Sequence, residues 1–274
     1  MAVNQSDKAT RFRALHQAPG AFIIANAWDA GSARAFAGLG FQAIATSSGA
    51  QANTLGKRDG TVSRDEALAH CRGIVEAVDL PVSADLERGF GDTPEIVAET
   101  ILRAGEIGLA GASIEDATAE RGKPVHDFAL SVERVAAAVQ AARALGFPFV
   151  LTGRAEGLLR GSTDIDDIIT RLQAYEKAGA DVLMAPGLPD LASVKKVCGA
   201  LTKPFNFMVG IPGKSFSVAE LQAAGVKRIS LATSLYKAAM TGAIEAAREA
   251  KDKGTFGYLD RSIPAAELNA FMQA

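Results

Sequence analysis

Cysteine is scarce in this sequence, and the two that occur, Cys71 and Cys198, both fall in helix-like stretches. Two cysteines placed in this way do not make the disulfide framework on which small secreted domains depend. Neither sign of charge is in excess, because 29 lysines and arginines are matched by 31 aspartates and glutamates without any block of like charges. Nucleic acid and anionic membranes are therefore not expected as main partners.

Long apolar runs are also missing. No stretch is long enough to span a bilayer, and residues 1–13 lack the apolar core of a signal peptide. We therefore expect no membrane partner and a cytoplasmic location. The sequence does contain 48% hydrophobic residues among 274, which suits a sizeable core. No linker-like shift in composition interrupts it, so we predict a single domain over residues 1–274.

One unit recurs along the chain: a short apolar run, a polar turn and an alanine-rich helical segment. The eight predicted strands are residues 22–25, 43–46, 82–85, 112–115, 149–152, 182–185, 205–209 and 228–232. The predicted helices between and after them are residues 31–38, 64–77, 94–107, 131–144, 165–178, 191–200, 218–223 and 234–252, with extra helices at 6–16 and 264–272. This alternation predicts an α/β fold, a (β/α)8 TIM barrel of parallel strands with helices outside. A doubly wound open sheet is the alternative, although no Gly-x-Gly-x-x-Gly motif follows the first strand.

Two carboxylates mark the end of the third predicted strand. Asp85 and Glu87 come where the strand ends, and Gly89 and Gly91 allow the backbone to turn away from it. Side chains two residues apart on extended backbone point the same way. Converging oxygen atoms are what a hard cation such as Mg²⁺ requires. A polar strand end leading into a solvated turn is the alternative interpretation.

Active sites of such barrels lie at the C-terminal ends of the strands, and other strand ends here are polar as well. They carry Asn26, Trp28 and Asp29 after the first strand, Thr46, Ser47 and Ser48 after the second, Glu115 and Asp116 after the fourth, Arg154 and Glu156 after the fifth, and Asn206 in the seventh. The opposite joints, from helix to strand, carry little beyond glycine and alanine. This asymmetry favours a functional role for Asp85, Glu87 and Glu115.

Several of these segments together resemble a known family. The motifs are Asn26-x-Trp28-Asp29, Thr46-Ser47-Ser48-Gly49, Asp85-x-Glu87-x-Gly89-Phe90-Gly91, Ile114-Glu115-Asp116 and Arg154-x-Glu156, and in this order they resemble the isocitrate lyase/phosphoenolpyruvate mutase superfamily. The resemblance spans nearly the whole chain. It implies a barrel that uses Mg²⁺, with Mn²⁺ as the alternative ion, and acts on small 2-oxo or 2-hydroxy carboxylates. It also implies a homotetramer or homodimer whose C-terminal helix is exchanged between subunits.

The resemblance also implies roles for single residues. Asp85 would be the most direct metal ligand, Glu87 and Glu115 would help to hold the metal through water, and Asp59 would contribute to its outer shell. The substrate site would contain Trp28 as a pocket wall, Ser47, Ser48 and Gly49 with their backbone N–H groups on the carboxylate, Arg154 on the carboxylate or the enolate oxygen, and also Glu156 and Asn206. The alternative for each of four residues is a purely structural role. Arg154 would then only pair with neighbouring carboxylates, Asp59 would be an ordinary turn residue, Trp28 would belong to the core and Asn206 would hold a loop in place.

The chain departs from the family pattern after the fourth strand. Isocitrate and methylisocitrate lyases carry a Lys-Lys-Cys-Gly-His loop there, whereas residues 117–127 of this chain contain no cysteine and no Lys-x-Asn arrangement of phosphonopyruvate chemistry. Of the groups present, Glu120, Lys123 and His126, only histidine titrates unperturbed near neutral pH. We predict that this loop closes as a lid and that the proton comes from His126 or from solvent. A solvated surface loop is the alternative, and His16 and His70 are expected at the surface.

The sequence therefore predicts a Mg²⁺-dependent lyase. Its reaction would cleave a C–C bond of a small 2-oxo or 2-hydroxy di- or tricarboxylate through a metal-bound enolate, with Asp85, Glu115, Arg154 and His126 as catalytic candidates. The alternatives are P–C chemistry on a phosphonopyruvate-like substrate, and decarboxylation or hydrolysis of oxaloacetate. An alternative of another class is a non-catalytic 2-oxo-acid binding protein that keeps the metal site.

Overall fold

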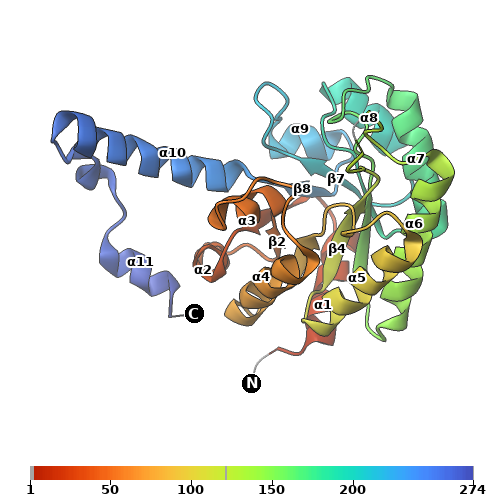
Figure 1. Cartoon of the computed structure of the whole chain (residues 1–274), viewed down its shortest axis with the longest axis horizontal. Helices are drawn as coiled ribbons and strands as arrows, with labels where there is room; N and C mark the ends of the chain where they lie inside the picture. Colours follow the sequence, from red (N-terminus) through yellow and green to blue (C-terminus); the bar gives the residue numbers. More distant parts are fainter. Residues whose placement is uncertain (1–2, 121, 274) are drawn as a thin grey trace.

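Eight parallel strands form a closed barrel in the computed structural model, which describes residues 3–120 and 122–273 (Figure 1). The strands pair in sequence order, and β8 closes the barrel against β1. Their bounds are β1 (Phe22–Ala27), β2 (Ile44–Thr46), β3 (Val82–Asp85), β4 (Gly111–Glu115), β5 (Val150–Arg154), β6 (Val182–Met184), β7 (Phe205–Met208) and β8 (Arg228–Ser230). The predicted (β/α)8 fold is confirmed, and each predicted strand is present with small shifts at its ends.

Helices surround the barrel and also cover its N-terminal end. They are α1 (Gln5–Gln17), α2 (Ala30–Gly38), α3 (Ser48–Thr54), α4 (Arg64–Ala77), α5 (Pro94–Glu106), α6 (Phe128–Ala144), α7 (Ile165–Ala178), α8 (Leu191–Gly199), α9 (Val218–Ala223), α10 (Ser234–Arg248) and α11 (Ala265–Phe271). None of the helices in the described parts of the chain is both long and apolar enough to cross a membrane.

Helix α1 closes the N-terminal end of the barrel. Its Phe12 is fully buried and packs in one apolar cluster with Ile24 of β1 and Val150 of β5. His16 follows one turn later and is only 7% exposed, with its ring packed edge-on against Phe12 and Phe22. The prediction that His16 lies at the surface is therefore wrong. It failed because residues before the first strand were read as an appendage, whereas they form the floor of the barrel.

His70 of α4 is also less exposed than predicted. It is partly buried, and its Nε2 atom lies 2.7 Å from the backbone oxygen of Trp28, which follows β1. Burial lowers the pKa of this imidazole, against the smaller opposing effect of that hydrogen bond. The ring therefore ties helix α4 to the loop after β1.

Helix α3 was not predicted. It begins directly after β2, where the hydroxyl of Ser47 caps it by accepting a hydrogen bond from the amide of Ala50. A helix of seven residues within Ser-Gly-Ala-Gln-Ala-Asn-Thr has too few apolar positions to show a helical period in sequence. The segment read as a turn is therefore the cap and first turn of a helix.

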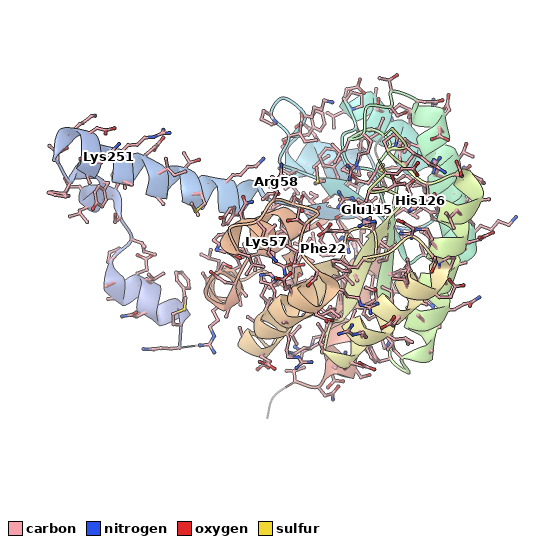
Figure 2. The ribbon with its side chains drawn as sticks, viewed as in Figure 1. Phe22, Lys57, Arg58, Glu115, His126 and Lys251 are labelled. Carbon is pink, nitrogen blue, oxygen red and sulfur yellow. The ribbon has the colours of Figure 1, made fainter. Side chains whose placement is uncertain are left out.

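The C-terminal part of the chain forms an arm that leaves the barrel (Figure 1). Helix α10 projects outward and continues as a π-helix (Glu249–Lys253), and Figure 2 shows Lys251 at the far end of this arm. The chain then passes through a 3-10 helix (Gly257–Arg261) and returns in α11 toward α2, where Arg34 donates a hydrogen bond of 2.7 Å to the backbone of Met272. No residue of these four helices is buried.

Candidate functional site

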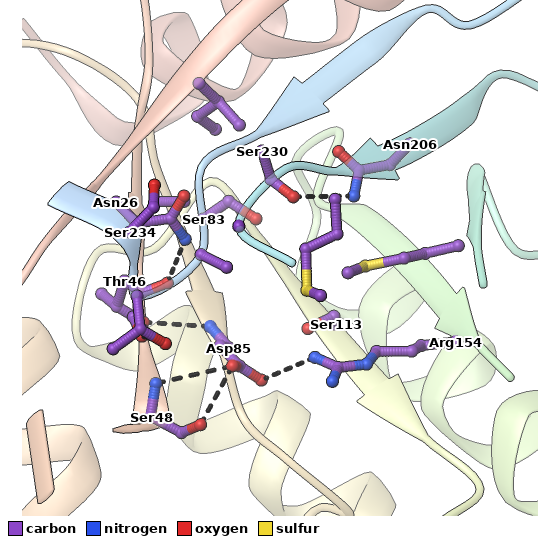
Figure 3. A pocket seen from close by; sticks show the side chains of 18 of the residues that line it. Asn26, Thr46, Ser48, Ser83, Asp85, Ser113, Arg154, Asn206, Ser230 and Ser234 are labelled. Carbon is purple, nitrogen blue, oxygen red and sulfur yellow. Dashed lines mark hydrogen bonds and ion pairs between the residues drawn. The ribbon is translucent and has the colours of Figure 1, made fainter. Parts of the chain in front are cut away.

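A cavity of about 260 Å³ opens at the C-terminal ends of the strands. Figure 3 shows that its labelled polar side chains come from strands all around the barrel, including Asn26, Asp85, Arg154 and Asn206. A second cavity of about 580 Å³ adjoins it, because Ser48, Asp59 and Arg154 line both. The outer cavity is bordered by the turn after β3 and by the segment after β4. Together they form one site at the face where (β/α)8 barrels bind their ligands.

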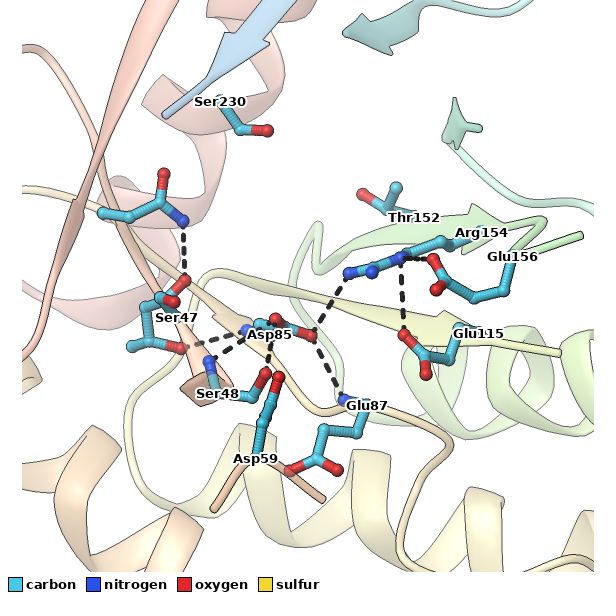
Figure 4. Close-up of polar contacts among 12 residues, drawn as sticks. Ser47, Ser48, Asp59, Asp85, Glu87, Glu115, Thr152, Arg154, Glu156 and Ser230 are labelled. Carbon is cyan, nitrogen blue, oxygen red and sulfur yellow. Dashed lines mark hydrogen bonds and ion pairs between the residues drawn. The ribbon is translucent and has the colours of Figure 1, made fainter. Parts of the chain in front are cut away.

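Asp85 is held in place by contacts from the end of β2, from the start of α3 and from its own turn. Its N–H donates to the hydroxyl of Thr46 at the end of β2, over 3.0 Å. Its carboxylate accepts from the hydroxyl of Ser48 at 3.1 Å and from the amide of Glu87 at 3.2 Å. These contacts fix the carboxylate toward the cavity (Figure 4).

The turn after Asp85 is strained, and this strain brings Glu87 back toward the site. Glu87 has φ 49° and Phe90 has φ 61°, values in the left-handed region that side chains with a Cβ rarely adopt. Such residues persist only where the surroundings hold them, and they gather at functional sites. Arg134 provides that support, since its guanidinium donates to the backbone oxygens of Gly91 at 2.7 Å and Arg88 at 2.5 Å.

Four carboxylates crowd this side of the site, and three of them have raised pKa values. Burial and then the charge of Asp85 and Asp59 raise the pKa of Glu87 to about 7. Burial and the charge of Asp85 raise the pKa of Asp59. For Glu115, burial raises the pKa well above its ordinary value, against the opposing effect of Arg154. Carboxyl groups that repel one another in this way favour a nearby cation.

Arg154 is the main positive charge within the acidic group. Its Nε atom lies 3.3 Å from Oε2 of Glu115 and is also hydrogen-bonded to Glu156, while its Nη1 atom lies 3.7 Å from Oδ1 of Asp85 (Figure 4). The side chain is only 12% exposed. The carboxylates raise the pKa of Arg154 well above its ordinary value, although burial alone would lower it. Arg160 approaches Glu115 from the solvent side, at 3.8 Å.

Asp116 holds the ends of β4 and β5 together, a role that the sequence did not reveal. Its buried carboxylate accepts hydrogen bonds from the amide of Glu156 at 2.8 Å, from the hydroxyl of Tyr175 at 2.8 Å and from Arg171 at 3.1 Å. The last two partners belong to α7, so no local pattern could connect them to Asp116. This network sets the position of Glu156, and through it that of Arg154.

The predicted substrate residues divide into those that line the inner cavity and those that do not. Ser47, Ser48 and Asn206 line it. Gly49 packs beside Asp59, whose Oδ2 atom would lie 3.2 Å from a Cβ at this glycine. Trp28 is not among the lining residues and packs instead between the rings of Phe36 and Tyr236, at 5.8 and 5.5 Å.

His126 does not reach the site. It is 4% exposed, its Nε2 atom lies 3.6 Å from Oδ1 of Asp92, and it lines neither cavity. Burial and then the charge of Arg134 lower its pKa. A backbone contact explains where the residue lies: the amide of His126 donates to the backbone oxygen of Asp116 at 2.8 Å, which fixes the end of the loop next to the end of β4. This geometry removes the motivation for His126 as a proton donor.

The described part of the loop after β4 is a pinned hairpin. Ala117 and Val125 form an antiparallel bridge, and the amide of Thr118 donates to the backbone oxygen of Pro124 at 3.2 Å. Lys123 forms an ion pair with Asp127 at 2.6 Å. The predicted lid motion finds no support in these contacts, although Thr118 does border the outer cavity.

The acidic group fits a hydrated cation better than an enclosed one. Across residues 3–120 and 122–273, no three acidic, histidine or cysteine side chains converge closely enough to surround a metal ion. Mg²⁺ usually keeps several waters and takes one or two carboxylates from the protein. Asp85 could serve as such a direct ligand, with Asp59, Glu87 and Glu115 binding through water. Burial and the charges of Asp85 and Asp59 raise the pKa of Glu87 to about 7, and a cation bound beside these carboxylates would lower it.

Comparison with known proteins places the chain among enzymes. The family model of phosphoenolpyruvate phosphomutase matches residues 12–251. The crystal structure of a protein from Burkholderia cenocepacia J2315, described as a putative lyase/mutase, has 49% sequence identity and a TM-score of 0.96, with 98% of each chain covered.

Two further relatives carry more specific names. The 2,3-dimethylmalate lyase of Eubacterium barkeri is 27% identical over 96% of this chain and 93% of that protein. A structure of oxaloacetate acetylhydrolase with the product oxalate is 26% identical, with a TM-score of 0.89, and covers 98% of this chain and 95% of that one. From the family model and the barrel geometry together, this chain is a member of the phosphoenolpyruvate mutase/isocitrate lyase superfamily.

Proposed function

We propose that this protein is a Mg²⁺-dependent lyase that breaks a C–C bond of a small 2-oxo or 2-hydroxy carboxylate. The observation that carries the proposal is the group of four carboxylates, Asp59, Asp85, Glu87 and Glu115, around one side of a cavity at the C-terminal end of the barrel. Arg154 provides only part of the charge that these groups require. A divalent cation with an anionic substrate completes the balance.

Breaking a C–C bond beside a carboxylate or carbonyl leaves its electron pair as an enolate, and the site suits that charge. Arg154 offers donors that are already oriented and that water does not reach easily, because its side chain is 12% exposed. Its planar fork matches carboxylate and enolate oxygens. Bound Mg²⁺ would supply a Lewis acid that polarises the oxygen on the bond to be broken.

The proton that quenches the enolate comes from solvent in this proposal. His126 is buried away from both cavities, and the two cysteines, Cys71 and Cys198, lie on α4 and α8, with thiol pKa values that burial raises to about 12. In this proposal the described part of the segment after β4 stays in place, held by the Ala117–Val125 bridge, and water reaches the outer cavity that it borders. The site therefore lacks the thiol of isocitrate lyases and uses water in its place.

Hydrolytic cleavage or decarboxylation of oxaloacetate is the second candidate. It is favoured by the same open outer cavity, since a reaction that consumes water needs water beside the substrate, and by the likeness to oxaloacetate acetylhydrolase. In both candidate reactions, a carboxylate of the substrate and the negative charge that develops on the enolate oxygen lie beside Arg154. They differ in their products: hydrolysis adds water and gives oxalate with acetate, and decarboxylation releases CO2 and leaves pyruvate.

The experiment is a substrate panel followed by proton and phosphorus NMR with Mg²⁺ present. The panel contains malate and its alkyl derivatives, oxaloacetate, isocitrate and phosphonopyruvate. Release of a 2-oxo acid and a second carboxylate from a 2-hydroxy acid supports the lyase, and oxalate with acetate from oxaloacetate supports the hydrolase. Phosphate release alone contradicts C–C cleavage. Binding of these acids without any turnover contradicts an enzyme and favours the binding protein.

The arm gives a further part of the proposal, a homodimer or homotetramer. Its apolar side chains at Met240, Ile244, Phe256 and Leu259 are between 39% and 61% exposed. Exposed apolar surface of this kind marks an interaction site. The C-terminal helix would then cover a second copy of the chain.

A further inference from the structure

The inner cavity continues into the interior of the barrel. Interiors of (β/α)8 barrels are usually filled by bulky branched side chains. Here the small residues Ala45, Ser83, Ser113 and Ser230 line the cavity beside the bulkier Ile24, Met184 and Met208, and Figure 3 shows Ser83, Ser113 and Ser230 around the same space. Small side chains leave room, so the cavity reaches past the acidic group toward the N-terminal end of the strands.

Arg228 lies at the inner end of this cavity. It is the first residue of β8, pairs with Phe22 at the start of β1, and is 5% exposed. It lines the same cavity as Asp85, which is the last residue of β3. One space therefore connects a buried cation at the floor with the carboxylates at the mouth.

The hydrogen-bond partners of Arg228 among the described residues are all neutral. Its guanidinium donates to Oδ1 of Asn206 at 2.8 Å and to the hydroxyl of Thr152 at 2.9 Å. The third partner is Nε2 of His16, at 3.4 Å from Nη1. His16 donates from Nδ1 to the backbone oxygen of Phe12 at 2.8 Å, which leaves Nε2 as an acceptor, and burial lowers its pKa to about 3, so the ring carries no charge.

The described residues offer Arg228 no carboxylate. None of the ion pairs within residues 3–120 and 122–273 includes it, and burial lowers its pKa to about 9 without any neighbouring negative charge to raise it again. Arg154, which also lines the cavity, pairs with Glu115, and the buried Arg171 pairs with Asp116. Arg134 is buried without a carboxylate partner among the described residues as well, but it donates to the backbone oxygens of Gly91 and Arg88 and lines neither cavity. A cation withdrawn from water without a counter-charge is costly, and three acceptors for five N–H groups leave donors unused.

We propose that the inner end of the cavity binds a carboxylate group, with Arg228 as its charge partner. That group is the distal carboxylate of the substrate, whose other end lies at the acidic group by the mouth. Thr152 and Arg154 are two residues apart on β5, so the two ends are separated by about 7 Å of strand. The preferred substrate is accordingly a dicarboxylate with a short carbon chain between its carboxylates. The identification of the bound group as part of the substrate rests on the proposed function, whereas the carboxylate site at Arg228 does not.

The test is isothermal titration calorimetry of the full chain in Mg²⁺ with oxalate, succinate, glutarate and acetate. Arg228→Met should weaken binding of succinate and glutarate about 10- to 100-fold, the loss of one charged hydrogen-bonded contact, and leave oxalate unchanged because its two carboxylates are adjacent. Lys227→Met is the matched control, since it removes a neighbouring positive charge that lies outside the cavity.

A second variant covers the case in which Arg228→Met does not fold. Ser113→Val fills the passage and removes no side-chain hydrogen bond found in the structure, so it should cause the same selective loss. A third result would be that acetate binds at the same time as oxalate and that this binding of acetate is lost in Arg228→Met. The inner end would then be a site for a separate small acid, and the distal-carboxylate assignment would be overturned. Wild-type affinities for all four acids in folded Ser113→Val would overturn the site itself. Calorimetry needs no turnover, so absence of lyase activity would contradict the proposed function and leave this result standing.

Discussion

Nη1 of Arg154 lies 3.7 Å from Oδ1 of Asp85, within reach of charge attraction but too far for a hydrogen bond. The same guanidinium is engaged more closely by Glu115, at 3.3 Å, and by Glu156. Asp85 instead accepts from the neutral hydroxyl of Ser48 and the amide of Glu87. Arg154 is therefore bound mainly by the other two carboxylates, and Asp85 keeps much of its charge available for a cation.

Replacing Arg154 by lysine should separate activity from stability. Lysine keeps the positive charge beside Glu115 and Glu156, so the free energy of unfolding should fall far less than in Arg154→Met, where breaking a buried pair costs about 3–5 kcal/mol. Lysine cannot offer the planar two-point contact, so kcat should fall about 100-fold or more. Steady-state kinetics and urea unfolding measure the two effects. A fully active Arg154→Lys enzyme would show that Arg154 only pairs with its neighbours.

His126→Ala should leave kcat, KM and the pH profile unchanged. The imidazole is 4% exposed, lies beside Asp92 and borders neither cavity. Proton transfer from solvent does not involve it. The measurement is kcat and kcat/KM from pH 5.5 to 9 for both proteins. A large fall in kcat with a flattened profile near neutrality would reinstate His126 as the proton donor and require the hairpin after β4 to open.

His16 should make the fold sensitive to acid. Its pKa is lowered to about 3 in the folded state and is close to 6.5 when unfolded, so below pH 6.5 the unfolded chain binds a proton that the folded chain does not. This contribution to the free energy of unfolding therefore falls as the pH drops from 6.5 toward 3, by up to about 1.4 kcal/mol per pH unit. In His16→Gln the slope between pH 6 and 4 should be shallower. Equal slopes in urea titrations of the two proteins would contradict the burial of a neutral ring.

The arm should hold the protein in an oligomer. Leu259 is 61% exposed on the 3-10 helix of the arm, and Leu259→Glu should lower the fraction of dimer or tetramer in light scattering. Leu102→Glu is the control, because this exposed leucine lies on α5 of the barrel and away from the arm. A monodisperse wild-type monomer at micromolar concentration would count against exchange of the arm between subunits.

The barrel could be predicted because its signals are local. Each strand is a short apolar run, and glycines such as Gly179, with φ 104°, end the preceding helix where only a residue without a Cβ is unstrained. It could also be predicted from the sequence that Asp85, Glu87 and Glu115 share one site, because the parallel strands of a barrel have all their C-terminal ends on one face. Asp59 reaches the same cavity from the loop before α4.

What the sequence did not predict depends on partners that are distant along the chain. Asp116 reads as a second acid beside Glu115, yet its carboxylate faces Tyr175 and Arg171 of α7. Arg228 belongs to a predicted strand. The pattern of that strand alone does not predict that the side chain of Arg228 faces the barrel interior, above α1. His126 was placed near the metal by its distance from Glu115 in sequence, and the hairpin directs it toward Asp92 instead.

The most direct test compares wild type, Asp85→Ala and the control Asp65→Ala in one assay of C–C cleavage, each with Mg²⁺ and with EDTA. Asp65 is an exposed acid on α4, paired with Arg103 at 2.6 Å, so its loss should leave the rate unchanged. We predict cleavage that stops with EDTA in wild type and falls at least about 100-fold in Asp85→Ala. The variant should unfold at the same or higher urea concentration without Mg²⁺, because one of four repelling carboxylates is gone. Full Mg²⁺-dependent cleavage by Asp85→Ala would contradict the assignment of this site.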